Sequence, residues 1–185
     1  MSLSSEEIAV TPNKIIVTAM PTPIMKFGDW KTSCAIGRNG AIARAEKREG
    51  DGCTPLGTYP LRPGFALAHR LANWPKSTRF AFTQQTPHDI WDNDPASPTY
   101  NQRALLDPDR VHAERLLRTD GLYDLIIPIG FNDNPTLAGR GSAIFIHIAT
   151  DDMAPTAGCI AVPRDRISSL VQLLTPDTLI EILPD

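Results

Sequence analysis

Short apolar runs separated by Pro, Gly, Asn and Asp make up most of this sequence. Runs of this length and punctuation are typical of β-strands. Two of them, at residues 122–131 and 142–149, are strongly apolar and rich in Ile, which predicts central strands buried on both faces. We expect further strands at residues 13–20, 32–37, 41–47, 58–61, 78–84 and 177–184.

Helical spacing is found in only two places. Residues 163–174 begin with Pro and carry apolar side chains three or four positions apart, as on one face of a helix. Residues 109–121 fit a second short helix, with Asp109 as its N-cap and Gly121 beyond its end. The pattern therefore predicts a mainly-β or α+β fold with two short helices.

Two polar segments interrupt the expected strands. The pair Asn39-Gly40 lies between residues 32–37 and 41–47 and favours a β-hairpin, because both residues tolerate a positive φ. Residues 87–101 have no apolar periodicity. Because they include two aromatic side chains, we expect an ordered loop there rather than a disordered one.

The length of 185 residues suits one domain with a sizeable core. Apolar residues make up 42% of the chain and charged residues 21%, and no repeat or linker divides it. The 17 prolines favour short strands and ordered loops over a helical bundle. We expect residues 1–12 to be disordered or tag-like and residues 13–185 to form a single domain.

Charge and hydropathy exclude two classes of function. The net charge is −3, the isoelectric point is near 5.8 and no run of Lys or Arg stands out, so no nucleic-acid partner is predicted. No apolar stretch approaches the ~18 residues of a membrane-spanning helix, so we expect no integral membrane segment. The opening MSLSSEEIAV lacks the basic and apolar regions of a signal peptide, and none is expected.

The three cysteines, Cys34, Cys53 and Cys159, are odd in number and form no C-x-x-C pair. Neither a disulfide framework nor a structural zinc site is expected from them. Cys53 lies in the Gly- and Pro-rich segment 49–57, which we interpret either as a turn that sets the next strand or as a wall of a cleft.

One His and one Cys stand at the two ends of a short polar excursion. His147 lies where an apolar strand ends, and Cys159 lies where the next apolar run begins. A neighbouring imidazole is what a thiol of ordinary pKa, about 8.5, needs to become a nucleophile. Strand alternation places His147 on the face opposite Ile146, which faces either the core or a cleft.

The spacing of His147 and Cys159 also fits two other interpretations. A hydrogen-bonded His at a strand end and a small buried Cys are common structural features. A metal site would combine the same two residues with Asp151 or Asp152, although such ligands are few and irregularly spaced.

Four stretches of the chain together resemble the L,D-transpeptidase catalytic domain of the YkuD type. The resemblance rests on His147 and, after it, Thr156, Gly158, Cys159 and Ile160. It extends to GRGSAIFIH at residues 139–147, EGDGCTPLGTYPL at residues 49–61 and WDNDPASPTYN at residues 91–101. These matches are dispersed in order across nearly the whole chain.

The resemblance implies a β-sandwich-like fold and a reaction. Cys159 would attack the diaminopimelate carbonyl of a peptidoglycan tetrapeptide stem, release the terminal D-alanine and form a thioester. An acceptor amine of a second stem would then take the acyl group, which is a step of cell-wall cross-linking. His147 would act as base and then acid, and the N–H groups of Gly158 and Cys159 would stabilise the oxyanion.

The resemblance also implies partners, inhibitors and a compartment. The expected partners are donor and acceptor tetrapeptide stems, with carbapenems as covalent inhibitors and no metal or organic cofactor. The substrate implies the periplasm or cell envelope. We expect seven residues to contact substrate: Thr156, Ala157, Arg140, Ser142, Asp94, Tyr100 and Trp91.

Two positions depart from the pattern of the family. Ala157 stands where many members have His, and Ala161 stands where many have Arg. The upstream His147 remains as a base, so these departures bear on substrate choice. Two alternatives stay open beside the transpeptidase: an L,D-carboxypeptidase or other hydrolase of the same stems, and a non-catalytic module that binds peptidoglycan.

Overall fold

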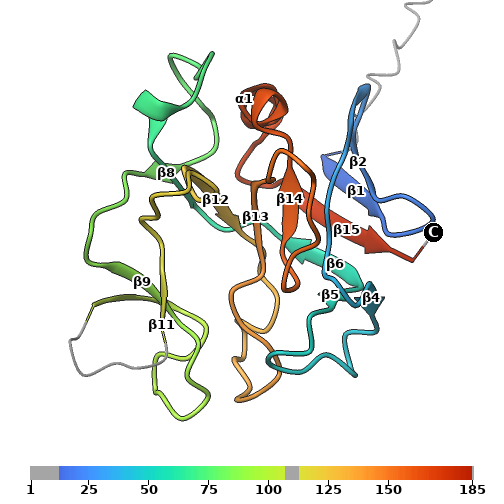
Figure 1. Ribbon diagram of the computed structural model, residues 1–185, viewed down its shortest axis with the longest axis vertical. Helices are drawn as coiled ribbons and strands as arrows, with labels where there is room; N and C mark the ends of the chain where they lie inside the picture. The colour runs from blue at the N-terminus through green and yellow to red at the C-terminus, as the bar shows by residue number, and fades with distance from the viewer. Residues whose placement is uncertain (1–12, 107–112, 185) are drawn as a thin grey trace, which may run out of the picture.

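Two five-stranded sheets form the body of the protein (Figure 1). The computed structural model describes residues 13–106 and 113–184. The prediction for residues 1–12 therefore lies outside the described residues. The first sheet has the spatial order β3 (Trp30–Ser33), β2 (Ile24–Phe27), β1 (Lys14–Thr18), β15 (Leu179–Leu183) and β6 (Gly57–Pro60).

In the second sheet, His147 lies on the strand next to one edge, and Cys159 directly precedes the edge strand. Its order is β14 (Ile160–Val162), β13 (Phe145–Ile148), β12 (Leu125–Pro128), β7 (Gly64–Ala66) and β8 (Phe82–Thr83). β14 runs parallel to β13, and β12 runs antiparallel to it. Two small sheets complete the fold: β10 (Arg103–Leu105), β9 (Asp89–Asp92) and β11 (Ala113–Arg115), and the pair β4 (Ala41–Ile42) and β5 (Thr54–Pro55).

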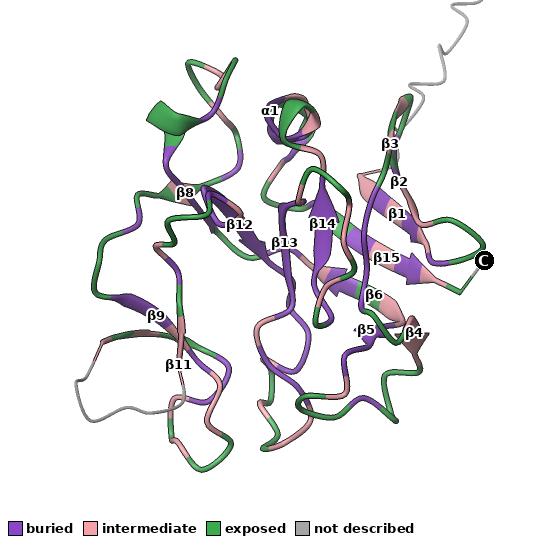
Figure 2. Cartoon of the chain, in the orientation of Figure 1, coloured by how far each residue is buried: buried purple, intermediate pink, exposed green. Residues whose placement is uncertain are grey.

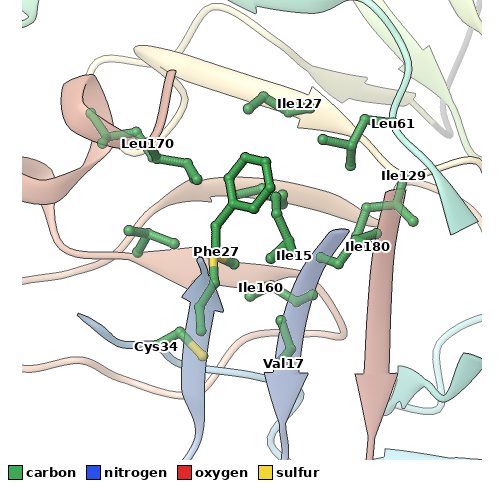
Figure 3. Close-up of a cluster of buried hydrophobic side chains, with 14 of the residues drawn as sticks. Ile15, Val17, Phe27, Cys34, Leu61, Ile127, Ile129, Ile160, Leu170 and Ile180 are labelled. Carbon is green, nitrogen blue, oxygen red and sulfur yellow. The ribbon is translucent and has the colours of Figure 1, made fainter. Parts of the chain in front are cut away.

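The main core lies between the two large sheets and is closed by one helix (Figure 3). Ile15 and Ile180 come from the first sheet, Ile160 from the second, and Leu170 from α1 (Arg164–Leu173). All four are fully buried. Sheet strands that bury one face in this way form a β-sandwich, so the predicted mainly-β sandwich is confirmed.

The strands β12, β13 and β14 are buried along their whole length, as their largely apolar sequences predict (Figure 2). Ile146 and Ile148 point into the main core, whereas Phe145 belongs to a second, smaller cluster on the other face. The predicted alternation along β13 is confirmed, and His147 lies on the face of the smaller cluster.

The helix predicted at residues 163–174 is confirmed as α1, which Pro163 precedes as N-cap. The helix predicted at residues 109–121 is wrong wherever it can be assessed. Residues 107–112 lie outside the described residues, and Ala113–Arg115 form β11, which pairs antiparallel with β9. Backbone pairing with a distant strand outweighs the weak local helical preference. A single 3-10 turn, η1 (Ala68–Arg70), is the other helical element described.

Three further local predictions need correction. The turn at Asn39-Gly40 forms, but β4 after it pairs with β5 and makes no hairpin with residues 32–37. The strand expected at residues 78–84 shrinks to the two residues of β8. The loop expected at residues 87–101 contains β9. In each case the strand partner is distant in sequence, and local pattern does not reveal it.

Within the parts of the chain that the structure describes, no helix is long and apolar enough to span a bilayer. The three cysteines are all free thiols and all buried.

The packing of β15 generates a prediction about stability. Replacing Ile180, which is 0% exposed, by Ala should lower the free energy of unfolding by about 2–5 kcal/mol, because it leaves a cavity in the main core. The neighbouring Leu179 is 36% exposed, and its replacement by Ala should change stability by less than about 1 kcal/mol. Urea denaturation measures both, and equal losses would contradict the assigned core.

Candidate active site

His147 is held in one tautomer by its own strand. Its Nδ1 lies 2.8 Å from the carbonyl oxygen of Ile148. Because a carbonyl oxygen only accepts, Nδ1 carries the ring proton and Nε2 keeps its lone pair in the neutral form. The imidazole therefore has a fixed orientation, and its Nε2 makes none of the hydrogen bonds seen among residues 13–106 and 113–184.

Burial keeps the imidazole neutral. His147 is 7% exposed, and the edge of the Tyr123 ring packs against it with 5.2 Å between ring centroids. Desolvation lowers the pKa of His147 to about 4, and the Arg118 guanidinium also disfavours a second positive charge. At neutral pH the ring is thus able to accept a proton.

Cys159 directly precedes β14 and faces the same side as His147. The cross-strand partner of His147 is Ala161, two residues after Cys159. Because alternate residues share a face, the thiol and the imidazole lie on one side of the sheet, offset by roughly 7 Å along the strands. Both line the same cavity.

The sulfur of Cys159 lies between one acceptor and one donor. Its S–H donates to the carbonyl of Ala143 at 3.1 Å, and it accepts from the N–H of Phe145 at 3.4 Å. The residue is 8% exposed. Desolvation raises the pKa of the thiol to about 12, the Glu114 carboxylate adds to the rise, and the Phe145 N–H opposes it. The resting side chain is a neutral thiol.

The turn before Cys159 is closed by one hydroxyl. Thr156 Oγ1 donates to the carbonyl of Cys159 at 2.6 Å and accepts from the N–H of Gly158 at 3.0 Å. Gly158 has a φ of +139°, and a Cβ there would lie 2.8 Å from the carbonyl oxygen of Cys53. Glycine is therefore required for this close approach. The N–H of Gly158, expected to face an oxyanion, is engaged by Thr156 in this conformation.

The Gly-rich segment 49–57 supports this turn from behind. Thr54 is fully buried; its hydroxyl accepts from the N–H of Gly37 and donates to the carbonyl of Gly158, both at 2.9 Å. A Cβ at Gly37 would collide with the backbone of Gly52. The segment thus braces the turn through backbone packing and one buried threonine.

A cavity of about 360 Å³ opens beside the thiol and the imidazole. Three of the residues expected to contact substrate, Ser142, Thr156 and Ala157, line it. Its full lining comprises Lys47, Glu49, Gly50, Asn93, Glu114, Arg118, Leu122, Tyr123, Ser142, Ala143, Ile144, His147, Thr150, Ala154, Pro155, Thr156, Ala157, Cys159 and Ala161.

The other four expected contact residues lie outside this lining. The guanidinium of Arg140 bonds to the carbonyl of Ala45 and lines a separate cavity of about 330 Å³. Trp91 and Tyr100 are tied into the protein by side-chain hydrogen bonds, and Asp94 accepts from a backbone N–H of its own turn.

Charged residues that the sequence analysis passed over line the cavity. Lys47 is 2% exposed and its ammonium is paired with Asp51 at 2.7 Å. Glu114 accepts a hydrogen bond from the hydroxyl of Tyr123, and the Arg118 guanidinium lies over the same ring at 4.9 Å. The helix predicted at residues 109–121 gave no reason to place Glu114 or Arg118 at the site. Glu114 is placed by the pairing of β11 with β9, and Arg118 follows three residues after β11.

Among the described residues, no three His, Cys, Asp or Glu side chains come together as metal ligands. The metal interpretation of His147 and Cys159, which would recruit Asp151 or Asp152, thus has no ligand set here.

Comparison with known proteins identifies the class to which this chain belongs. Residues 14–182 match the family model of YkuD, the L,D-transpeptidase catalytic domain. The match covers nearly the whole chain, and the chain is a member of the L,D-transpeptidase catalytic domain family, which acts on peptidoglycan. The comparison with curated proteins gives no match.

The burial of His147 predicts a pH dependence of stability. An ordinary histidine has a pKa of 6.5, so the unfolded chain binds a proton that folded His147, with a pKa of about 4, does not. The free energy of unfolding should therefore fall by about 3 kcal/mol as the pH falls from 6.5 to 4. Urea denaturation of the wild type and of His147→Gln over this range measures it.

The difference between the wild type and His147→Gln in the pH dependence of the free energy of unfolding isolates the contribution of His147, since both proteins carry the same carboxylates. If His147→Gln loses as much stability as the wild type over this range, the low pKa is refuted.

Proposed function

We propose that this protein is a cysteine-dependent L,D-transpeptidase that acts on peptidoglycan stem peptides. The observation that carries the proposal is the convergence of Cys159 and His147 on one cavity, with Nε2 of His147 left free by the Ile148 carbonyl. A thiol and an oriented neutral base on a stiff sheet are the groups that acyl transfer through a thioester requires.

The first half-reaction forms the thioester. The sulfur of Cys159 attacks the diaminopimelate carbonyl carbon at its bond to the terminal D-alanine, and the thiol proton passes to Nε2 of His147. A C–S bond forms and the carbonyl becomes an oxyanion. When the tetrahedral intermediate collapses, the C–N bond breaks, and the imidazolium gives its proton to the leaving amine of D-alanine.

The second half-reaction transfers the acyl group. Nε2 of His147 takes a proton from an acceptor amine, which attacks the thioester carbonyl. A C–N bond forms, the C–S bond breaks, and the proton returns to the sulfur of Cys159. One histidine thus serves each half-reaction as base and then as acid, and no metal or organic cofactor takes part in these steps.

The resting protonation states favour proton transfer during attack rather than before it. Burial raises the pKa of the Cys159 thiol and lowers that of the His147 imidazole, so an ion pair of the two is disfavoured. Proton transfer coupled to C–S bond formation avoids a free thiolate in this apolar cluster.

We propose the backbone N–H of Cys159 as a donor to the oxyanion. The N–H of Gly158 joins it only when the Thr156 hydroxyl releases that group, because the two are 3.0 Å apart at rest. A peptide N–H fixed in a tight turn is a suitable donor to a developing negative charge, and for Gly158 the release of Thr156 must come first.

The charges of the cavity suit the far end of a diaminopimelate side chain, which bears an ammonium and a carboxylate. Glu114 offers a carboxylate to the ammonium, and Arg118 offers a guanidinium to the carboxylate. Ser142, Thr156 and Ala157 would contact the stem peptide, as the resemblance implies.

The remaining expected contact residues act from outside the cavity lining in this proposal. Trp91 and Tyr100 hold the wall of the cavity, and Asp94 and Arg140 meet only a long ligand that extends beyond it. A domain that acts on peptidoglycan works outside the cytoplasm, so we propose the periplasm or the cell envelope as its place.

A carbapenem tests the nucleophile. Incubation followed by intact-mass and peptide mass spectrometry should show one adduct on Cys159, because ring opening mimics the acylation step. Cys159→Ala should give no adduct, and His147→Gln should slow acylation on the order of a hundredfold through loss of the base. Cys34→Ala, which removes a thiol of the main core, is the matched control and should react like the wild type. Unmodified wild-type protein would favour a non-catalytic module that binds peptidoglycan.

The acceptor is tested by product analysis with a disaccharide-tetrapeptide. The transpeptidase should release D-alanine and form a cross-linked dimer joined through two diaminopimelate residues. Release of D-alanine with only the disaccharide-tripeptide as partner product would instead show that water resolves the thioester, as in an L,D-carboxypeptidase. Liquid chromatography with mass spectrometry separates the two products, and Cys159→Ala should give neither.

A further inference from the structure

Ala143 has an unusual backbone conformation beside the thiol. Its φ is +53°, in the left-handed region that residues other than glycine rarely adopt, and it immediately precedes the buried residues that lead into β13. Such a conformation costs roughly 1–3 kcal/mol and persists only where the surroundings hold it. The carbonyl of this same residue accepts the thiol proton of Cys159 at 3.1 Å.

One buried asparagine holds the amide of Ala143. Asn101 Oδ1 accepts from the N–H of Ala143 at 3.1 Å and from the indole N–H of Trp91 at 3.0 Å. Its amide nitrogen donates to the carbonyls of Phe131 at 3.0 Å and Asn132 at 2.8 Å. Asn101 is 5% exposed; its two bonds to Phe131 and Asn132 are buried, those to Ala143 and Trp91 are part-buried, and the four bonds together leave its side chain little freedom to move.

Tyr100 and Glu49 hold Gly141 and Ser142, the two residues before Ala143. The hydroxyl of Tyr100 accepts from the N–H of Gly141 at 3.1 Å and donates to the carboxylate of Glu49. The hydroxyl of Ser142 donates to the same carboxylate at 2.8 Å. Residues 141–143 are thus held at consecutive positions by Tyr100, Glu49 and Asn101.

We infer that Asn101 is a positioning residue for Cys159: it holds Ala143 in its left-handed conformation so that the Ala143 carbonyl fixes the thiol. The inference rests on the proposed function in one respect, that Cys159 is the nucleophile. Asn101 is absent from the cavity lining and acts on the sulfur through the Ala143 peptide.

The carbonyl of Ala143 has two opposing effects on the sulfur. As an acceptor it stabilises the neutral thiol and repels a thiolate. As a fixed contact it also places the sulfur where attack can be coupled to proton transfer. Loss of Asn101 should therefore make Cys159 easier to ionise and, at the same time, a poorer nucleophile towards a bound substrate.

Other titratable groups also line the cavity beside the sulfur. Glu114 comes from β11, Lys47 and Glu49 from the loop before β5, and His147 from β13, with Tyr123 and Arg118 also in the cavity wall. None of these six side chains bonds to Asn101 in the described hydrogen bonds; Glu49 bonds to the neighbouring Tyr100 and Ser142. We therefore expect a change in thiol ionisation in Asn101→Gly to come chiefly from the Ala143 carbonyl.

Asn101→Gly is the sharpest variant, because the φ of Asn101 is +59° and glycine adopts that angle without strain. Asn73→Gly is its control. Asn73 has a φ of +57°, so glycine is equally compatible with its backbone, but it is an exposed residue outside the cavity lining, and none of the described hydrogen bonds joins its side chain to Asn101 or to residues 141–143.

Two rates are measured on the full chain. Alkylation by iodoacetamide at pH 8, resolved by peptide mass spectrometry, reports the ionisation of Cys159. Cys34 and Cys53 in the same digests report any general loosening. Acylation by a carbapenem reports positioned attack.

For Asn101→Gly, we expect alkylation of Cys159 to rise about tenfold, the change produced by a pKa lowered by one unit when one hydrogen bond is lost. Carbapenem acylation should fall at least about tenfold, since a misplaced sulfur loses the benefit of orientation. Asn73→Gly should change either rate by less than about twofold, as expected for a surface variant away from the functional contact.

Several outcomes would overturn the inference. Unchanged rates in Asn101→Gly would do so, and so would parallel increases at Cys34, Cys53 and Cys159. If the carbapenem never acylates the wild type, the proposal that Cys159 is the nucleophile is refuted, and the comparison of alkylation rates still tests the role of Asn101.

If Asn101→Gly does not fold, hydrogen exchange of backbone amides in the wild-type protein tests the role of Asn101 instead. The Ala143 amide hydrogen should then exchange with solvent as slowly as that of Ile146. Exchange as fast as that of an exposed loop amide would refute the inference that Asn101 holds Ala143.

Discussion

The parallel pairing of β13 with β14 is the constraint on which the site depends. The register sets His147 opposite Ala161, and because side chains alternate along a strand, the thiol two residues earlier faces the same side. A shift of one residue would turn Cys159 into the main core and Ile160 into the cavity. The buried isoleucines of both strands resist such a shift, so the hydrophobic core determines the placement of the reactive groups.

Burial gives the site its chemical character. The same apolar cluster that surrounds the thiol and the imidazole keeps both uncharged, since neither the thiolate nor the imidazolium is solvated there. In the proposed reaction, a site with this balance holds a neutral thiol until a substrate carbonyl lies close to it. The charged residues Lys47, Glu114 and Arg118 lie in the cavity wall, and the first two act on the pKa of the Cys159 thiol in opposite directions: Glu114 raises it and Lys47 lowers it.

Segments far apart in sequence hold the chain on either side of Cys159, the proposed nucleophile, through buried and half-buried hydrogen bonds. Thr54 holds Gly158, Asn101 holds Ala143, and Glu49 holds Ser142. Each bond joins a polar side chain to one of the two segments that flank the cavity. This explains in physical terms why the stretches at residues 49–61 and 91–101 accompany the His and the Cys in one chain, although few of their side chains enter the cavity.

The amino-acid sequence by itself determined the mainly-β character, the helix at residues 163–174, the alternation along β13 and the candidate pair His147 and Cys159. These features depend on local periodicity and on residue chemistry. Only the tertiary structure decided that residues 113–115 form a strand, that β4 pairs with β5, and that Glu114 and Arg118 rather than Arg140 line the cavity. The reason is that strand pairing and the direction of loop side chains depend on contacts between residues far apart in the chain, which no local pattern records.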